Sequence, residues 1–261
     1  MERLSDNNST PSGIQSNTLR IWGFVFLTLG ILGKGLLQNR YLQLDQLTPQ
    51  QLLEIMSASG TAMILATAAL ALQAVETCAV PLFSFLLVEG FAHSGSRKKY
   101  FLRVAGLAVL SEIPYNLAIS GQLLDTASRN PVFGLALGLI LMYFWNRFDR
   151  QDFPGKLLRF AITAAAVFWA GMLKIDHGVP MIVIIGTLWL LRKKPQLRTL
   201  VGSVAAMACS AVSPFYLASA MGFLPIHMYN GEREQFERRT HYIVYPVLLL
   251  AVWAAGTVFF K

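Results

Sequence analysis

Long apolar runs separated by short polar connections dominate this chain. Four of them cover Leu19–Gln38, Tyr100–Ala118, Pro131–Phe148 and Thr240–Phe260. A helix needs about 20 mainly apolar residues to cross the hydrocarbon of a bilayer, and such a helix satisfies its own backbone hydrogen bonds in lipid. The alternating pattern of a β-barrel is absent from the sequence. The pattern therefore predicts an all-α integral membrane protein, a polytopic bundle of eight or nine transmembrane helices.

Two basic loops orient the predicted helices. Lys and Arg gather over residues 97–103 and 192–198, and loops on the cytoplasmic side of a membrane carry an excess of these residues. We place the mixed loop Arg147–Arg159 on the same side. Three segments then face outward, and the C-terminal Lys261 ends inside. The outward segments are 119–130, 174–177 and 221–240.

One apolar stretch leaves the number of spans open. The run Met56–Phe91 is too long for one span and barely long enough for two spans joined at Gln73–Thr77. With eight spans, the count we favour, the N-terminus is inside and Ser57–Ala71 lies at the interface or re-enters the membrane. With nine spans the N-terminus is outside.

Composition agrees with a membrane protein and excludes other classes. Hydrophobic residues make up 54% of the chain and charged residues 14%, against about 25% charged residues in soluble domains. The net charge of +8 does not indicate nucleic-acid binding, because the basic residues flank apolar spans. Cys78 and Cys209 lie in apolar stretches and indicate packing, with no metal-ligand spacing. We expect one transmembrane domain over residues 19–261, with the lipid bilayer as its partner, after a polar tail over residues 1–18.

Polar groups inside the predicted spans are the strongest functional signal. A charged residue within a span costs roughly 2.5–3.5 kcal/mol on insertion scales, so it tends to face the bundle interior and mark a site. Glu112 lies deep in one span, with Pro114 and Asn116 beside it. Proline frees a backbone carbonyl and bends a helix. Glu112 then either handles a substrate or a proton, or it pairs with a neighbouring helix for packing alone.

Other candidates lie at the ends of spans. Asp176 and His177 precede an apolar run, where Asp suits an N-cap, while the imidazole of His177 suits a general base at neutral pH. Glu89, His93 and Arg97 follow one another at helical spacing, as either a ligand site or an interfacial cluster. Under the predicted topology, eight candidates map to the outward half of the bundle. They are Glu112, Asn116, Arg129, Asn130, Asp176, His177, Tyr229 and Asn230.

Several sequence motifs resemble the TraX family of membrane proteins. The run Val80–Ala118 reads VPLFSFLLVEGFAHSGSRKKYFLRVAGLAVLSEIPYNLA and is the longest of these motifs. Three shorter pieces follow in the family order: NPVFGLALG from Asn130, IDHG from Ile175, and YNG from Tyr229 with a later Tyr245–Pro246. The resemblance covers about Val80–Pro246, with a weaker match over Leu19–Leu37.

The resemblance implies an activity. The namesake of the family is linked to N-terminal acetylation of conjugative pilin, and the family resembles transmembrane acyltransferases that use cytoplasmic coenzyme A thioesters. It therefore implies a membrane-bound acyltransferase of the bacterial cytoplasmic membrane, with acetyl-CoA as the acyl donor and a protein or glycan amine or hydroxyl as the acceptor. Eight residues occupy family motif positions: Glu89, His93, Arg103, Glu112, Asn130, Asp176, Tyr229 and Asn230.

The sequence also departs from the family pattern. An Asp-His pair is usual in the first span, where this chain has Gly30 and Ile31, and Leu248 replaces a histidine near the C-terminus. His177 stands where the family favours Tyr and is a candidate for a relocated base. Lys34, near the lost pair, is a candidate contact for the acyl carrier.

These observations give each candidate residue an expected role. Asp176, His177 and Glu112 are expected to be catalytic. The acceptor is expected to contact Asn116, Arg129, Asn130, Tyr229 and Asn230. The phosphates of coenzyme A are expected near Glu89, His93, Arg97 and Arg103, where Arg side chains suit phosphate. Two rival interpretations remain: a catalytically silent scaffold or permease-like relative, and a proton-coupled transporter built around Glu112.

Overall fold

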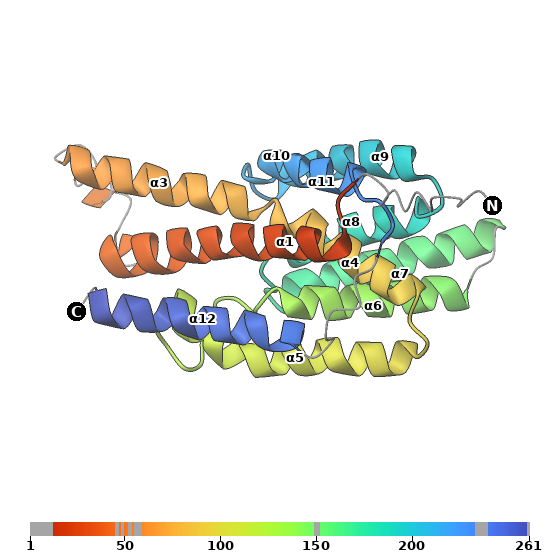
Figure 1. The fold of residues 1–261 in the computed structure, drawn as a ribbon, viewed down its shortest axis with the longest axis horizontal. Coiled ribbons are helices and arrows are strands. Elements are labelled where there is room, and N and C mark those ends of the chain that lie inside the picture. Colours follow the sequence, from red (N-terminus) through yellow and green to blue (C-terminus); the bar gives the residue numbers. More distant parts are fainter. Residues whose placement is uncertain are drawn as a thin grey trace, which may run out of the picture.

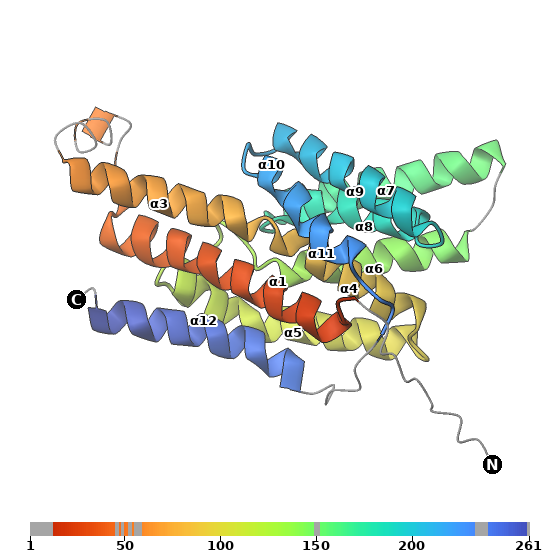
Figure 2. The same cartoon turned by 45° about the horizontal axis from the view of Figure 1, so that its top comes forward.

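The chain forms a bundle of helices running between two ends (Figures 1 and 2). The computed structural model describes residues 13–44, 47, 50–51, 54, 59–148, 152–232 and 240–259. Within them, the elements are α1 (Ser16–Ile31), η1 (Leu32–Tyr41), α3 (Gly60–Glu76), α4 (Ala79–Ala92), α5 (Arg97–Ile119), α6 (Val132–Arg147), α7 (Phe153–Met172), α8 (Gly178–Leu190), α9 (Pro195–Ala208), η3 (Cys209–Ala211), α10 (Tyr216–Ser219), η4 (Ala220–Gly222), α11 (Phe223–His227) and α12 (Thr240–Phe259). The expected polar tail lies outside the described residues up to residue 12.

The predicted all-α membrane class is confirmed, whereas the expected number of eight or nine spans stays a prediction. Helices account for nearly all described elements, and four runs are long and apolar enough to cross a membrane: Ser16–Tyr41, Gly60–Ala92, Arg97–Ile119 and Phe153–Met172. Three shorter apolar helices accompany them. Large apolar side chains such as Phe160, Phe168 and Leu110 are exposed on the outer surface, as lipid-facing residues of a multi-pass membrane protein are. The central helix α8 is the reverse, with Ile182, Ile184, Ile185 and Leu188 fully buried.

The ambiguous stretch of the sequence forms one run. Ser59 caps α3 by accepting a hydrogen bond from the amide of Ala62. After a two-residue break, α4 continues in the same direction as α3. The evidence is the run formed by α1 and η1, which lies antiparallel to both helices: Gly33 in η1 contacts α3, and the earlier Gly23 in α1 contacts Phe83 of α4. The stretch is therefore neither two opposed spans nor a re-entrant Ser57–Ala71 segment, of which residues 57 and 58 lie outside the described part.

The final helix runs parallel to the first. Arg40, near the end of η1, donates hydrogen bonds to the carbonyls of Trp253 in α12 and Leu117 in α5. The last turns of η1, α5 and α12 therefore meet at one end of the bundle. We call this the distal end. The other end, where α5, α7 and α9 begin and the basic loops lie, is called the basic end. Figure 1 shows α12 approaching the distal end near the C mark.

Helices α9, α10 and α11 form a hairpin that returns to the basic end. Its tip reaches the break between α3 and α4, where Thr77 donates a hydrogen bond to the carbonyl of Phe215. From there α11 packs beside α9, and the amide of Ile14 donates to the carbonyl of Met228 just before α1. The expectation that residues 221–240 face outward is therefore wrong for the described part of that segment. A hydropathy pattern does not distinguish a hairpin that turns back from a span that crosses.

This topology gives a direct labelling prediction. In a chain with both cysteines replaced by alanine, single cysteines at Gly95 and Met228 are expected to react with a membrane-impermeant maleimide from one side. Cysteines at Leu123 and Val258 react from the other, since α5 and α12 both end there. Met228, Leu123 and Val258 are exposed apolar positions. At Gly95 an added Cβ would meet open space. If cysteines at Met228 and Leu123 reacted from the same side, the topology expected from hydropathy would be correct.

Candidate functional site

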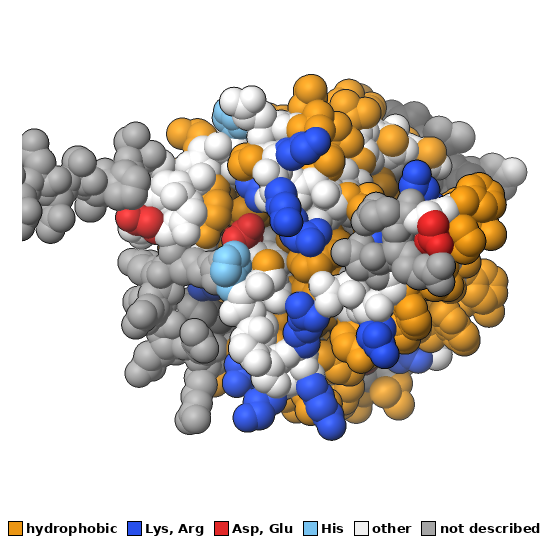
Figure 3. Space-filling view, turned by 90° about the vertical axis from the view of Figure 1, so that its right-hand side faces the viewer, with side chains coloured by type: hydrophobic (Ala, Val, Ile, Leu, Met, Phe, Trp, Pro, Cys, Tyr) orange, Lys and Arg blue, Asp and Glu red, His pale blue; other side chains and the backbone are white. Residues whose placement is uncertain are grey.

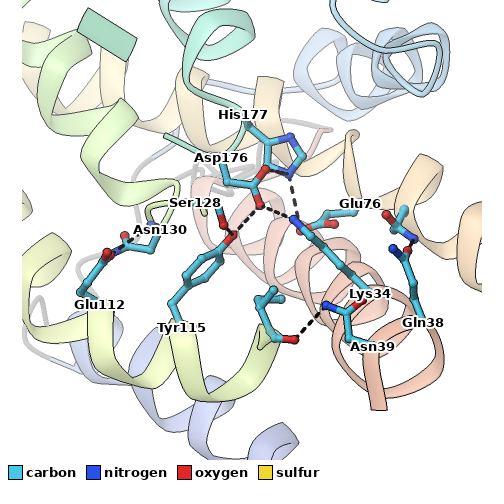
Figure 4. A network of polar contacts seen from close by, with 12 residues as sticks. Lys34, Gln38, Asn39, Glu76, Glu112, Tyr115, Ser128, Asn130, Asp176 and His177 are labelled. Atoms are coloured by element: carbon cyan, nitrogen blue, oxygen red, sulfur yellow. Dashed lines mark hydrogen bonds and ion pairs between the residues drawn. The ribbon is translucent and has the colours of Figure 1, made fainter. Parts of the chain in front are cut away.

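A cluster of charged side chains lies in the interior, contributed by separate elements (Figure 4). Nζ of Lys34, from η1, lies 3.2 Å from Oδ2 of Asp176. Nε2 of His177 lies 3.6 Å from Oε1 of Glu76, at the end of α3, and 4.0 Å from Oδ1 of Asp176. The sequence prediction that Asp176 and His177 act together is consistent with this proximity, and the structure adds Lys34 and Glu76 to them.

The loop before α8 is held in place by backbone contacts. The amide of Arg129 donates to the carbonyl of Lys174, and the amide of Asp176 donates to the carbonyl of Arg129, each at 2.9 Å. His177, rather than Asp176, is the N-cap residue of α8 and has a φ of +56°. Residues other than Gly adopt this left-handed conformation infrequently, and such strain tends to occur at functional sites. The side chains of Asp176 and His177 are thus fixed at the N-terminus of α8.

The Asp176 carboxylate has several donors. The Tyr115 hydroxyl, from α5, donates to its Oδ2 at 2.6 Å and also lies 3.3 Å from the Ser128 hydroxyl. Burial alone would raise the pKa of Asp176, but the positive charges of His177 and Lys34, together with these hydrogen bonds, hold it well below its ordinary range. Asp176 therefore favours the ionised form, paired with Lys34.

His177 is held between acids on one side and a phenol on the other. Its Nδ1 contacts the hydroxyl of Tyr216, at the tip of the hairpin. Burial alone would lower the pKa of His177, but the negative charges of Asp176 and Glu76 raise it above its ordinary value. The imidazole can consequently take up a proton readily. Its Nδ1 contacts the Tyr216 hydroxyl, whereas its buried Nε2 has no hydrogen-bond partner among the described residues.

Two cavities meet at this cluster. A polar cavity of about 410 Å³ is lined by Lys34, Glu76, Asp176, His177 and Tyr216, among others. A second, narrower and almost wholly apolar cavity of about 90 Å³ is lined by residues of α1, α4, α5, α6, α8 and α12. Glu76 and His177 line both. The pair therefore stands where a polar and an apolar compartment of the bundle adjoin.

Glu76 lies directly against Gly30 of α1. A Cβ atom built on Gly30 would clash with the carboxylate of Glu76. Because Gly30 has no side chain, the Glu76 carboxylate can lie against α1 and come within reach of His177. The expected Asp-His pair is absent at Gly30 and Ile31, and the carboxylate beside Gly30 comes from α3 instead.

Glu112 belongs to a separate, fully bonded group. Its Oε1 accepts from Arg129 at 3.0 Å, and its Oε2 accepts from the backbone amide and the side-chain amide of Asn130 at 3.1 and 2.7 Å. Asn130 also donates to the carbonyl of Ala108. This group clamps the segment before α6 onto α5, and that segment holds the Asp176 loop. Asn116 is buried on the same helix and donates to the carbonyl of Leu123.

The remaining candidates lie at the basic end. Glu89 is 3.6 Å from Arg198, whose guanidinium stacks on Phe85, and it accompanies His93 one turn along α4. Arg97 stacks on Phe91, and Arg103 is exposed on α5.

Tyr229 and Asn230 also lie at this end. The Tyr229 ring packs on Phe85 with a centroid separation of 5.2 Å, and the Asn230 amide donates to the carbonyl of Ile14. Their expected place in the outward half is wrong, because the hairpin returns them to the basic end. The structure therefore does not bring them together with Asp176 and His177.

Sequence reasoning missed Glu76, Tyr115 and Tyr216, and it also missed Tyr245, whose ring lines the apolar cavity. Glu76 had a usable signal, a carboxylate inside an apolar stretch, but that stretch was interpreted as a turn between spans. Tyr115 lies within the SEIPYNLA motif. For Tyr216 the sequence offers no signal, because its contact depends on the hairpin.

Residues 46–255 match the family described as TraX protein. The chain is also similar to a probable fimbrial assembly protein FimC, serogroup H1, of Dichelobacter nodosus, with 29% identity over 185 residues. The similarity covers 68% of this chain and 63% of that relative. The chain therefore spans less than two thirds of the relative's length. No solved structure matches the chain.

The contact between Gly30 and Glu76 leads to a prediction about stability. Gly30→Ala is expected to lower the unfolding temperature, because the new methyl group must displace a buried carboxylate and separate it from His177. Overpacking of this kind costs about 1–3 kcal/mol. Gly106→Ala in α5 is the control, since its Cβ would meet open space, and a helical glycine replaced there gains up to about 1 kcal/mol. Equal effects of the two substitutions on thermal unfolding in detergent would contradict the close contact.

Proposed function

Because the chain belongs to the TraX family, we propose that it is a membrane-bound acyltransferase. Its donor is a coenzyme A thioester such as acetyl-CoA, and its acceptor is an amine or hydroxyl that enters the polar cavity. The observation that supports this most is the position of Glu76 and His177, which line both the polar and the apolar cavity. An acyl group in one cavity and a nucleophile in the other would meet at the imidazole.

The reaction needs one base at that meeting point. His177 takes the proton from the acceptor N–H or O–H as the acceptor attacks the thioester carbonyl, which forms a tetrahedral intermediate. Collapse of the intermediate breaks the C–S bond, and the imidazolium returns the proton to the departing thiolate. Removal of a general base typically lowers the rate about 10²–10⁴-fold. Lys34 supplies a positive charge close to where the oxyanion develops.

The neighbouring acids orient and charge the base. Asp176 and Glu76 lie on the Nε2 side of the ring, at 4.0 and 3.6 Å, and stabilise the imidazolium that forms during attack. Glu112, with Arg129 and Asn130, acts at a distance by holding the segment to which the Asp176 loop is bonded. We therefore assign Glu112 a positioning role in place of the proton transfer expected from its sequence alone.

The two substrates approach from opposite ends in this proposal. The basic residues at one end suit the phosphates of a cytoplasmic donor, with Glu89, His93, Arg97 and Arg103 as the sequence candidates, and Tyr229 and Asn230 lie on that side. The acceptor enters from the distal side, near Asn116 and Ser128. The similarity to a fimbrial assembly protein favours a protein of surface-fibre assembly as the acceptor over a glycan, in the bacterial cytoplasmic membrane.

A catalytically silent relative is the second candidate. It is favoured by Gly30, Ile31 and Leu248 at positions where the family pattern has an Asp-His pair and a second histidine. In that case the cluster would be structural, and the purified protein would neither bind nor cleave an acyl thioester.

Substitution of the base separates the two candidates. His177→Ala is expected to reduce acetyl-CoA-dependent thiol release by purified protein 10²–10⁴-fold, while His227→Ala, which alters an exposed histidine on α11, leaves it unchanged. Glu112→Gln is expected to lower thermal stability more than turnover per folded molecule. A folded wild-type protein without thiol release, or a fully active His177→Ala variant, would contradict the proposed reaction.

The pH profile tests the charge environment of the same residue. Because nearby acids raise the pKa of His177, the neutral base is scarce at low pH, and kcat/KM is expected to rise with pH through a value above about 6.5. Glu76→Gln removes one of those negative charges and should move the rising limb to lower pH. An unmoved limb in Glu76→Gln would show that another group governs the profile.

A further inference from the structure

A third cavity lies at the basic end, between the final turns of α6 and α8 and the first part of α7. Its volume is about 410 Å³, the same as that of the polar cavity. Its walls include Trp145, Arg159 and Trp189, followed by the tripeptide Arg192, Lys193 and Lys194. Figure 3 looks onto this end and shows Lys and Arg side chains set among apolar ones.

The charge lining this cavity is of one sign. Four of its described lining residues are cationic and none is acidic, whereas the polar cavity combines Lys34 and Lys174 with Glu76 and Asp176. A cavity lined by one sign of charge concentrates ligands of the opposite sign. Topology alone requires cations on this side of the membrane, but it does not require that they surround a cavity.

An aromatic contact also holds one of these cations in place. The Arg192 guanidinium lies 3.9 Å from the centroid of the buried Trp189 ring and donates to the Trp189 carbonyl at 2.7 Å. The indole of Trp145 donates to the Arg159 carbonyl at 3.3 Å. A guanidinium held flat on a ring keeps N–H groups free to bind a second partner, and a planar fork of donors matches phosphate oxygens.

From these observations we propose that this cavity binds a phosphate-bearing ligand. Two sources share that chemistry: a soluble phosphate compound such as coenzyme A, and the headgroup of an anionic phospholipid. The proposal does not require that the chain transfers an acyl group, since it rests on the charge, volume and fixed side chains of the cavity alone.

The sequence supplies a matched control for the test. The tripeptide Arg-Lys-Lys occurs twice, as Arg192–Lys194 beside the cavity and as Arg97–Lys99 in the first turn of α5. Replacing the two lysines of either tripeptide by glutamine removes the same charge at the same end of the bundle. Lys193 and Lys194 line the cavity, whereas Lys98 and Lys99 do not, and Arg97 is left unchanged.

Binding would be measured on the full chain in two arms. In phosphatidylcholine nanodiscs, coenzyme A is titrated by calorimetry. In nanodiscs doped with phosphatidylglycerol, the retained lipid is counted by native mass spectrometry. We expect one arm to show binding that is weakened at least tenfold by Lys193→Gln with Lys194→Gln and less than twofold by Lys98→Gln with Lys99→Gln. The arm that responds identifies the source of the phosphate.

A conservative variant keeps the test decisive if the double replacement does not fold. Arg192→Lys retains the charge but loses the forked guanidinium over Trp189, and we expect it to weaken binding severalfold. Absence of binding to the unmutated protein in both arms would overturn the proposal. Equal weakening by the two double replacements would overturn it as well, because it would indicate attraction to the surface charge in general.

Discussion

The need to pair buried charges governs the arrangement of this bundle. Charges removed from water are costly unless they are paired and hydrogen-bonded, and the interior contains the linked charges of Lys34, Asp176, His177 and Glu76. These residues come from η1, from the loop before α8 and from α3. Pairing them requires that these segments meet, with Gly30 providing the space for Glu76. Helices that would otherwise slide along one another in lipid are thereby fixed in register.

The same requirement connects the site to the segments around it. The clamp formed by Glu112, Arg129 and Asn130 fixes the chain before α6, and the backbone pairing of Arg129 with Ile175 carries that order to Asp176. From the other side, the hairpin brings Tyr216 to the imidazole. A base held on several sides is preorganised, which is the condition under which electrostatic catalysis is effective.

Much of this was accessible from the sequence, for identifiable reasons. Hydropathy predicted an all-α membrane protein because lipid permits few other solutions. The positions of Glu112, Asp176 and His177 in or beside apolar spans marked them as polar residues of interest. The hairpin was missed because its apolar pattern resembles that of spanning helices, so Tyr229 and Asn230 were placed at the wrong end. Glu76 was missed because its partner, His177, lies 101 positions further along the chain. Periodicity carries no information on contacts of this kind.

The central claim is that the interior charges form one coupled unit, and a double-mutant cycle between Lys34→Met and Asp176→Asn tests it most directly. Each single substitution breaks the ion pair between Lys34 and Asp176, and breaking a buried pair costs about 3–5 kcal/mol. The account predicts that the double variant loses less stability in reversible unfolding than the sum of the two single variants, with a coupling of about 0.5–3 kcal/mol. Strictly additive losses would show that the two charges do not interact and would contradict the account.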